Sequence, residues 1–244
     1  MLNTFLGCFY RESLRFLRTP FQTIFNTVFS SILLGLAFYF YNPKNILFLV
    51  PGLIFFSSYQ VISSNLRMIL FVGRMDGILN YQIIAPISKY SLYLIYIIVS
   101  ILRAALVVTP LLVLLNIFIF EIRIYNWTLL LFCFFISSLF IANISCILCL
   151  YYKDWNSFGS IENYIITPLI FLSGAFYPLS NIPIQYKNIF LLNPFFHFIN
   201  TLRFASSNSY DINLLLSSMV CLFLCFLTTI ICLVLFHKGY RFQK

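Results

Sequence analysis

Residues that could carry acid, base or metal chemistry are few in this chain of 244 residues. Six carboxylates are present, and each lies at the edge of an apolar segment rather than inside one: Glu12, Asp76, Glu121, Asp154, Glu162 and Asp211. Catalysis needs several such groups converging on one site, and no H-E-x-x-H, G-x-S-x-G or clustered carboxylate pattern occurs. We therefore expect no enzymatic activity and no bound cofactor.

The seven cysteines offer the other source of chemistry. Cys146 and Cys149 form a C-x-x-C pair, but all seven cysteines fall in apolar segments. Neither His197 nor His237 has a ligand-like neighbour at a useful spacing. This context favours small, polarizable residues that pack between helices over a redox or metal centre.

The sequence has no obvious energy source for transport. A phosphate-binding loop needs G-x-x-x-x-G-K-[ST], and none of the eight glycines has that spacing. An ion-driven carrier normally has acidic residues within its spans, and here there are none. If the protein moves a substrate uphill, another chain must hydrolyse the ATP.

Composition decides the fold class. Hydrophobic residues make up 61% of the chain and charged residues 9%, whereas soluble domains have about 25% charged residues. The apolar residues come in blocks of about 20, the length of a membrane-spanning helix, without the alternation of a β-barrel. We predict an all-α integral membrane protein, and we attribute the net charge of +9 to basic loops rather than to nucleic-acid binding.

Six transmembrane helices are expected, at roughly residues 21–41, 46–71, 92–120, 127–151, 164–177 and 212–236. Residues 1–20 are expected to form an interfacial amphipathic helix, because Arg11, Arg15 and Arg18 share one helical face. The short fifth span is followed by the Pro-broken stretch 178–205, which predicts a re-entrant hairpin before the last span.

A polar segment, residues 73–89, interrupts the apolar sequence and must lie at a membrane surface. With the termini and loop 153–163 it holds nine basic residues: Arg11, Arg15, Arg18, Arg74, Lys89, Lys153, Lys238, Arg241 and Lys244. The opposite side holds four: Lys44, Arg123, Lys187 and Arg203. The positive-inside rule therefore places both termini and segment 73–89 in the cytoplasm, or in the stroma of a plastid.

Two further arginines lie within apolar segments. Arg67, near the end of one segment, is expected to snorkel to the cytoplasmic headgroups. Arg103 lies about three turns into the third span, where it either snorkels or makes an inter-helix structural contact, or else lines a substrate path.

Three stretches give the chain a resemblance to the permease subunits of the ABC-2 type exporter family. They are LVPGLI at residues 49–54, the polar segment at 74–88, and PLIFLSGAFYPL at 168–179. The third stretch continues into Pro183, Leu192-Asn193-Pro194 and Arg203. The chain looks most similar to short bacterial inner-membrane permeases and their plastid-encoded relatives.

This resemblance implies a homodimer, formed with a second permease copy in membrane lipid, bound to cytoplasmic P-loop ATPase subunits. Segment 73–89 would be a coupling helix in a groove of the ATPase, with Gly77 allowing close backbone approach and Pro86 ending the helix. The candidate coupling residues are Arg74, Asp76, Gly77, Asn80 and Pro86. Asn80 departs from the family pattern, which usually has Glu at that position.

The expected function is export of an amphipathic or apolar substrate, driven by ATP hydrolysed in a separate subunit. Arg103, Ser173 and Gly174 are candidate substrate-path residues, although close helix packing is the favoured role of Ser173 and Gly174. The alternatives are a non-transporting membrane anchor or assembly protein, and an ion-coupled secondary transporter.

Overall fold

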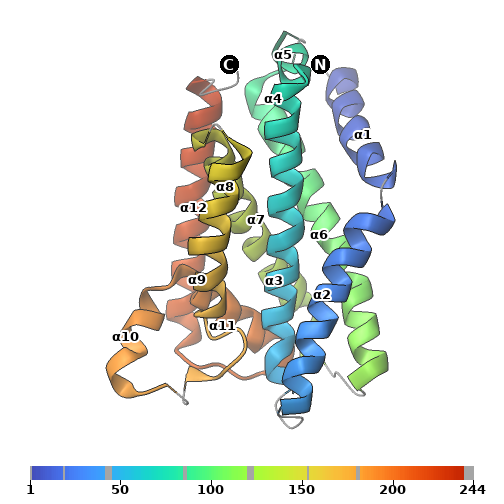
Figure 1. The fold of residues 1–244 in the computed structure, drawn as a ribbon. Coiled ribbons are helices and arrows are strands. Elements are labelled where there is room, and N and C mark those ends of the chain that lie inside the picture. The colour runs from blue at the N-terminus through green and yellow to red at the C-terminus, as the bar shows by residue number, and fades with distance from the viewer. Residues whose placement is uncertain are drawn as a thin grey trace.

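A computed structural model describes residues 2–18, 20–41, 46–84, 87–119, 124–152, 154–179 and 182–238. Within these ranges all the long elements are helices, and no strand occurs (Figure 1). In chain order they are α1 (Leu2–Arg18), α2 (Pro20–Tyr41), α3 (Ile46–Arg67), the π-helical segment η2 (Met68–Val72), α4 (Gly73–Met75), α5 (Ile78–Ile84), α6 (Lys89–Ile119), α7 (Trp127–Tyr151), α8 (Trp155–Ile161), the π-helical segment η3 (Glu162–Ile166), α9 (Thr167–Phe171), α10 (Ile184–Leu192), α11 (Pro194–Ser207) and α12 (Leu214–Lys238). The predicted all-α class is confirmed.

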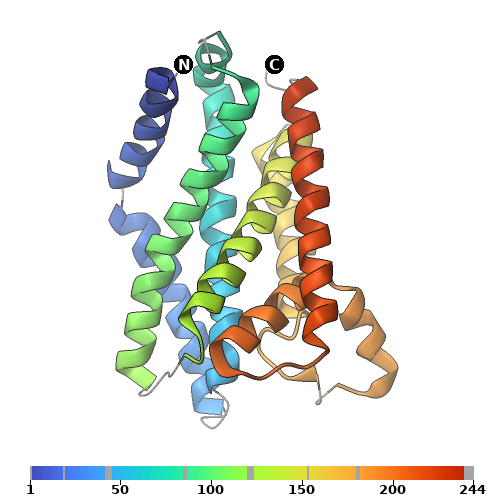
Figure 2. The ribbon, with the colours of Figure 1, turned by 180° about the vertical axis from the view of Figure 1, so that it is seen from behind.

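Three helical stretches of the described chain are long and apolar enough to cross a membrane. They are Lys89–Ile117 in α6, Trp127–Tyr151 in α7 and Leu214–Lys238 in α12, and a shorter apolar helix covers Phe25–Phe40. The long helices run side by side as one bundle (Figures 1 and 2). The start of α1, the end of α12, and α4 and α5 lie at one end of the bundle, whereas α10 and α11 lie at the other.

The start of α7 shows how local sequence sets a helix end. The Asn126 side chain accepts hydrogen bonds from the backbone N–H groups of Thr128 at 3.0 Å and Leu129 at 3.2 Å. Such an N-cap satisfies donors that have no partner within the helix. From there α7 runs to Tyr151 without a proline or glycine, over the residues expected for the fourth span.

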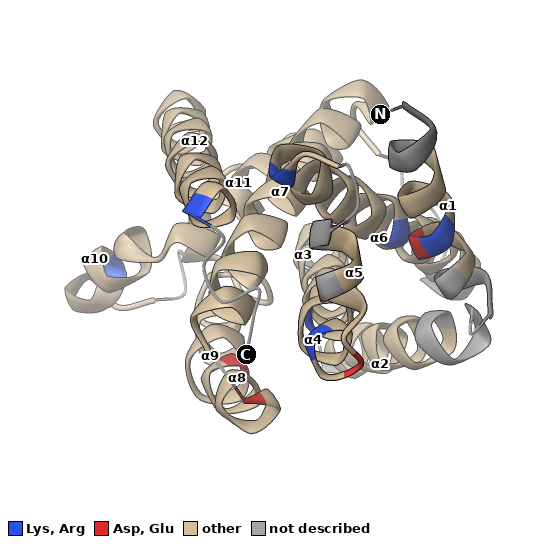
Figure 3. Ribbon diagram, turned by 90° about the horizontal axis from the view of Figure 1, so that it is seen from above, with Lys and Arg blue, Asp and Glu red and all other residues tan. Residues whose placement is uncertain are grey.

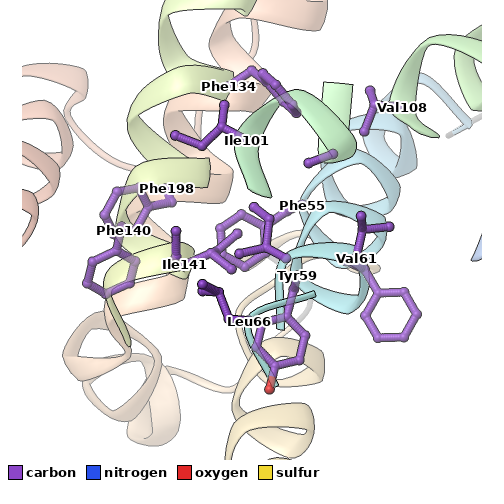
Figure 4. Packing of buried hydrophobic residues seen from close by; sticks show 14 of the residues in the cluster. Phe55, Tyr59, Val61, Leu66, Ile101, Val108, Phe134, Phe140, Ile141 and Phe198 are labelled. Carbon is purple, nitrogen blue, oxygen red and sulfur yellow. The ribbon is translucent and has the colours of Figure 1, made fainter. Parts of the chain in front are cut away.

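Helix α3 lies against most of the bundle and supplies much of its buried core (Figure 4). Phe55 of α3 packs against Phe195 and Phe198 of α11, and Phe140 of α7 stacks on Phe198 with ring centroids 4.3 Å apart. At Gly52, an added Cβ atom would lie 2.3 Å from the carbonyl oxygen of Ala175. Only glycine lets α3 approach the chain after α9 this closely, so this contact positions Ser173 and Gly174.

The first helix differs in placement from the sequence expectation. An interfacial helix at residues 1–20 should lie in the plane of the headgroups, across the end of the bundle. Helix α1 instead leans along the upper part of α6 (Figures 1 and 2). A buried polar contact, described below, explains this position. The side chains of Arg15 and Arg18 lie outside the described residues.

The stretch expected as the fifth span, residues 164–177, is also shifted. The helix begins earlier, at Trp155, continues through α8, η3 and α9, and ends at Phe171. Phe158 is buried near the start of this helix, and the left-handed φ of +69° at Gly174 turns the chain soon after its end. The stretch predicted as a hairpin, residues 178–205, contains the two helices α10 and α11.

Candidate functional site

The polar segment forms a short helical excursion at the end of the bundle. Helix α4 ends at Met75. The backbone N–H of the C-cap residue Asp76 donates to the Val72 carbonyl at 2.9 Å, and Gly77 then redirects the chain into α5. Met75 and Tyr81 are each 75% exposed, and Asp76 is also exposed. The segment therefore presents apolar and acidic side chains on a structured surface beyond the long helices.

Gly77 has a conformational role. Its φ is +71°, in the left-handed region that side chains disfavour. A Cβ atom added there would meet nothing within 4 Å in the described part of the chain. The backbone turn is therefore one reason for glycine here, and the close approach to an ATPase groove stays a prediction.

Arg74 ties the polar segment to α7. Its Nε donates to the Leu70 carbonyl at 2.8 Å, and its Nη2 donates to the Cys149 carbonyl at 2.7 Å. Carbonyls in the last turn of a helix have no partner within it, so Arg74 satisfies one of them near the end of α7. Its guanidinium carbon lies 4.5 Å from the centroid of the Phe71 ring. Arg74 is therefore a structural link, a role that the sequence analysis did not predict.

Two buried residues hold α5 in place. Leu79 is 1% exposed, and its side chain packs beside Gly73, where an added Cβ atom would lie 3.4 Å from the Leu79 Cγ. Gln82 is 4% exposed and accepts a hydrogen bond from the Tyr96 hydroxyl of α6. Asn80 and Pro86 are the two remaining candidate coupling residues. The side chain of Asn80 and all of Pro86 lie outside the described residues.

Arg67 does not snorkel to the headgroups as expected. Its Nη1 pairs with the Glu162 Oε2 at 3.0 Å, and the Ser63 hydroxyl donates to the Glu162 Oε1 at 2.6 Å. The guanidinium also lies over the Trp155 ring, 4.8 Å from its centroid. One π-helical segment begins directly after Arg67 and the other begins at Glu162. The ion pair therefore joins the two helices where both depart from α-helical geometry.

This ion pair should contribute measurably to stability. We expect Arg67→Gln and Glu162→Gln each to lower the thermal midpoint in detergent, because each leaves one partly buried charge without its partner. The double variant should lose less than the two single losses combined, with an interaction energy of about 1–3 kcal/mol. Strictly additive losses would show that the two charges do not stabilise each other.

Arg103 connects three helices. Its Nη2 donates to the backbone carbonyl of Glu12 in α1 at 2.8 Å, and its Nη1 donates to the Asn65 side chain of α3. Asn65 in turn donates to the Ser100 hydroxyl at 2.7 Å. These bonds give Arg103 the inter-helix contact that was one of its expected roles, and they hold α1 against α6. Its substrate-path role stays a prediction.

Ser173 and Gly174 lie at the other end of the bundle, next to a buried arginine. The Ser173 hydroxyl donates to the Ile170 carbonyl, and the Gly174 carbonyl accepts from Arg203 Nη2 at 2.5 Å. Arg203 also pairs with Asp211, and its guanidinium carbon lies 3.5 Å from the centroid of the Phe48 ring. Burial lowers the pKa of Arg203, while the negative charge of Asp211 opposes that shift.

The structure therefore separates the predicted site residues into two groups. Arg74, Asp76 and Gly77 lie at the end that carries α4 and α5, whereas Ser173 and Gly174 lie towards the end that carries α10 and α11 (Figure 1). The sequence analysis missed the central position of Arg203. The available signals were the family motif that extends to Arg203 and an aspartate eight residues further on, and neither predicts a contact with Gly174.

Comparison with known proteins identifies the family. The family model described as ABC-2 type transporter matches residues 3–206, which include the polar segment and the stretch around Ser173 and Gly174. The chain belongs to the ABC-2 type transporter family. This result confirms the resemblance noted in the sequence, and the chain is accordingly an integral membrane protein of a transporter family.

Curated relatives of this ABC-2 family chain carry a transport name. The inner membrane transport permease YadH of Escherichia coli K12 is 21% identical over 192 residues, covering 79% of this chain and 75% of that protein. Proteins of the same name from Escherichia coli O157:H7 and Shigella flexneri match with the same identity and coverage.

Proposed function

We propose that this chain is the membrane-spanning permease subunit of an ATP-binding cassette exporter in the bacterial inner membrane, or in a plastid membrane. A separate cytoplasmic P-loop ATPase subunit supplies the energy, and an amphipathic or apolar substrate crosses the membrane. The observation that carries the proposal is the helical segment Gly73–Ile84, which exposes Met75, Asp76 and Tyr81, in a chain of the ABC-2 family. It is the kind of structured surface on which a partner subunit docks.

The proposed topology has six spans. They are α2, α3 with η2, α6, α7, the continuous stretch α8–η3–α9, and α12. The start of α1 and the end of α12 share one end of the bundle with α5, which supports placing both termini in the cytoplasm or stroma. Helices α10 and α11 would form the re-entrant hairpin on the opposite side, and a second permease copy would complete a homodimer.

The contacts of the polar segment suggest how a movement of the ATPase reaches the spans. Arg74 bonds to the end of α7, and Gln82 bonds to Tyr96 of α6. The segment is therefore attached to two long helices by polar contacts rather than by a loose loop. A push on α5 would be passed to α6 and α7 together.

Co-expression with an ATP-binding cassette subunit chosen from the genes that neighbour this one tests the proposal. We expect the two proteins to co-purify, and we expect ATP hydrolysis to increase when both are reconstituted in lipid nanodiscs. A chain that binds no ATPase would instead be a membrane anchor or assembly protein. Transport that persists after ATP depletion but collapses with an uncoupler would identify an ion-coupled carrier.

A further inference from the structure

A pocket of about 300 Å³ lies between α1 and the segment η2–α5. Its polar lining consists of Arg11, Glu12, Asp76 and Gln82, and its apolar lining includes Leu14 and Val72. Figure 3, which looks onto this end of the bundle, shows charged positions on both α1 and the segment at α4. The volume is at the lower end of the range for small-molecule sites, about 300–1,000 Å³, and it suits a headgroup better than a whole lipid.

Gln82 gives the pocket a hydrogen-bond donor that is not used within the described chain. The side chain is 4% exposed, and its Oε1 accepts from Tyr96. Its Nε2 is buried and has no hydrogen-bond partner among the described residues. A buried donor left unpaired costs about 1–3 kcal/mol. A ligand with an acceptor oxygen at this point would recover that free energy.

The charged side chains that line the pocket are of both signs. Arg11 pairs with Glu12, and Arg103, which does not line the pocket, bonds to the backbone carbonyl of Glu12. Asp76 supplies the second carboxylate, and it lies exposed at the opposite wall. One arginine and two carboxylates line the pocket, and this mixture favours a ligand with one positive and one negative group over a purely anionic one.

The position of the pocket points to a lipid. It lies at the end of the bundle where the membrane-length apolar helix α6 begins, and we infer the membrane surface at this level. Leu14 and Val72 would contact the apolar part of the molecule below its headgroup. A free polar metabolite would gain little binding free energy from contact with that apolar lining.

We propose that this pocket binds the headgroup of a zwitterionic phospholipid with a primary ammonium group, such as phosphatidylethanolamine. The ammonium group pairs with Asp76, and the phosphate accepts hydrogen bonds from Gln82 Nε2 and Arg11. The quaternary ammonium of phosphatidylcholine cannot donate hydrogen bonds and is recognised less well. This site needs no ATPase, so its test is independent of the proposed function.

Native mass spectrometry of the purified protein tests this site. The protein is mixed in detergent with equal amounts of dioleoyl phosphatidylethanolamine, phosphatidylcholine and phosphatidylglycerol. We expect phosphatidylethanolamine to be retained most. Asp76→Asn should weaken its binding about two- to fivefold, as expected for an exposed ion pair. Gln82→Glu, which keeps the acceptor for Tyr96 but replaces the amide donor, should weaken it about tenfold.

Asp154→Asn is the matched control, because Asp154 is an exposed carboxylate that does not line the pocket. It should retain phosphatidylethanolamine as the original protein does. Soluble phosphoethanolamine at the same concentration should not displace the lipid, and displacement would overturn the lipid assignment in favour of a soluble ligand. Equal retention of the three lipids, a preference for phosphatidylglycerol, or normal binding by Asp76→Asn would also overturn the proposal.

Discussion

Replacing Arg203 with methionine is expected to destabilise the protein by about 3–5 kcal/mol, because the change leaves the partly buried Asp211 carboxylate and the Gly174 carbonyl without their partner. Arg203 is 1% exposed and bonds to both Asp211 and the Gly174 carbonyl. Methionine has a similar length but no donor and no charge. We expect a large fall in the midpoint of thermal unfolding in detergent. The midpoint is measured by size-exclusion chromatography of samples heated to increasing temperatures.

Lys187→Met is a suitable control for this prediction. Lys187 is a basic residue of α10, at the same end of the bundle, and its side chain is only partly buried. The same loss of one positive charge should change the midpoint little there. Adding Asp211→Asn to Arg203→Met should recover part of the lost stability, because it removes the uncompensated carboxylate. Equal midpoints for Arg203→Met and Lys187→Met would show that the Arg203 contacts do not support the fold.

Replacing Gly77 with valine is expected to abolish most of the stimulation of the partner ATPase while the membrane domain stays folded. The left-handed backbone at Gly77 costs a residue with a side chain about 1–2 kcal/mol. That cost shifts the equilibrium of the turn about five- to thirtyfold towards other conformations, and α5 then moves relative to α4. Because a Cβ atom at this position meets nothing within 4 Å, the damage should stay local. The measurement is ATP hydrolysis by the co-reconstituted subunits.

Gly7→Val provides the matched control for the turn. Gly7 also has open space around its missing Cβ, but it lies within α1 at an ordinary helical φ. This variant should stimulate the ATPase normally. A companion variant, Asp76→Lys, reverses the exposed charge next to Gly77 and should weaken docking. If Gly77→Val and Asp76→Lys both co-purify with the ATPase and stimulate it normally, segment 73–89 is not the coupling element.

Several features of the protein could be predicted from short-range sequence patterns. Apolar blocks of membrane-spanning length gave the all-helical membrane class, because the bilayer requires each span to satisfy its own backbone hydrogen bonds. The bounds of α7 agree with the expected stretch because Asn126 and the uninterrupted apolar run are local signals. The family, too, was recognisable from three short motifs. The six-span topology and the coupling role are proposals that rest on these patterns.

The polar contacts could not be predicted, because they join residues far apart in the chain. Ser63 and Glu162 are 99 positions apart, Arg103 and Glu12 are 91 apart, and Arg203 and Gly174 are 29 apart. The sequence alone placed Arg67 at a headgroup and α1 in the membrane plane, since snorkelling and amphipathicity are the usual behaviour of such residues. Hydropathy is a property of each segment by itself, and it decides whether that segment lies in lipid or in water. The rotation of each helix, and so the face that meets a neighbour, is set only when side chains pack, and that packing decided the partners of Arg67, Arg103 and Arg203.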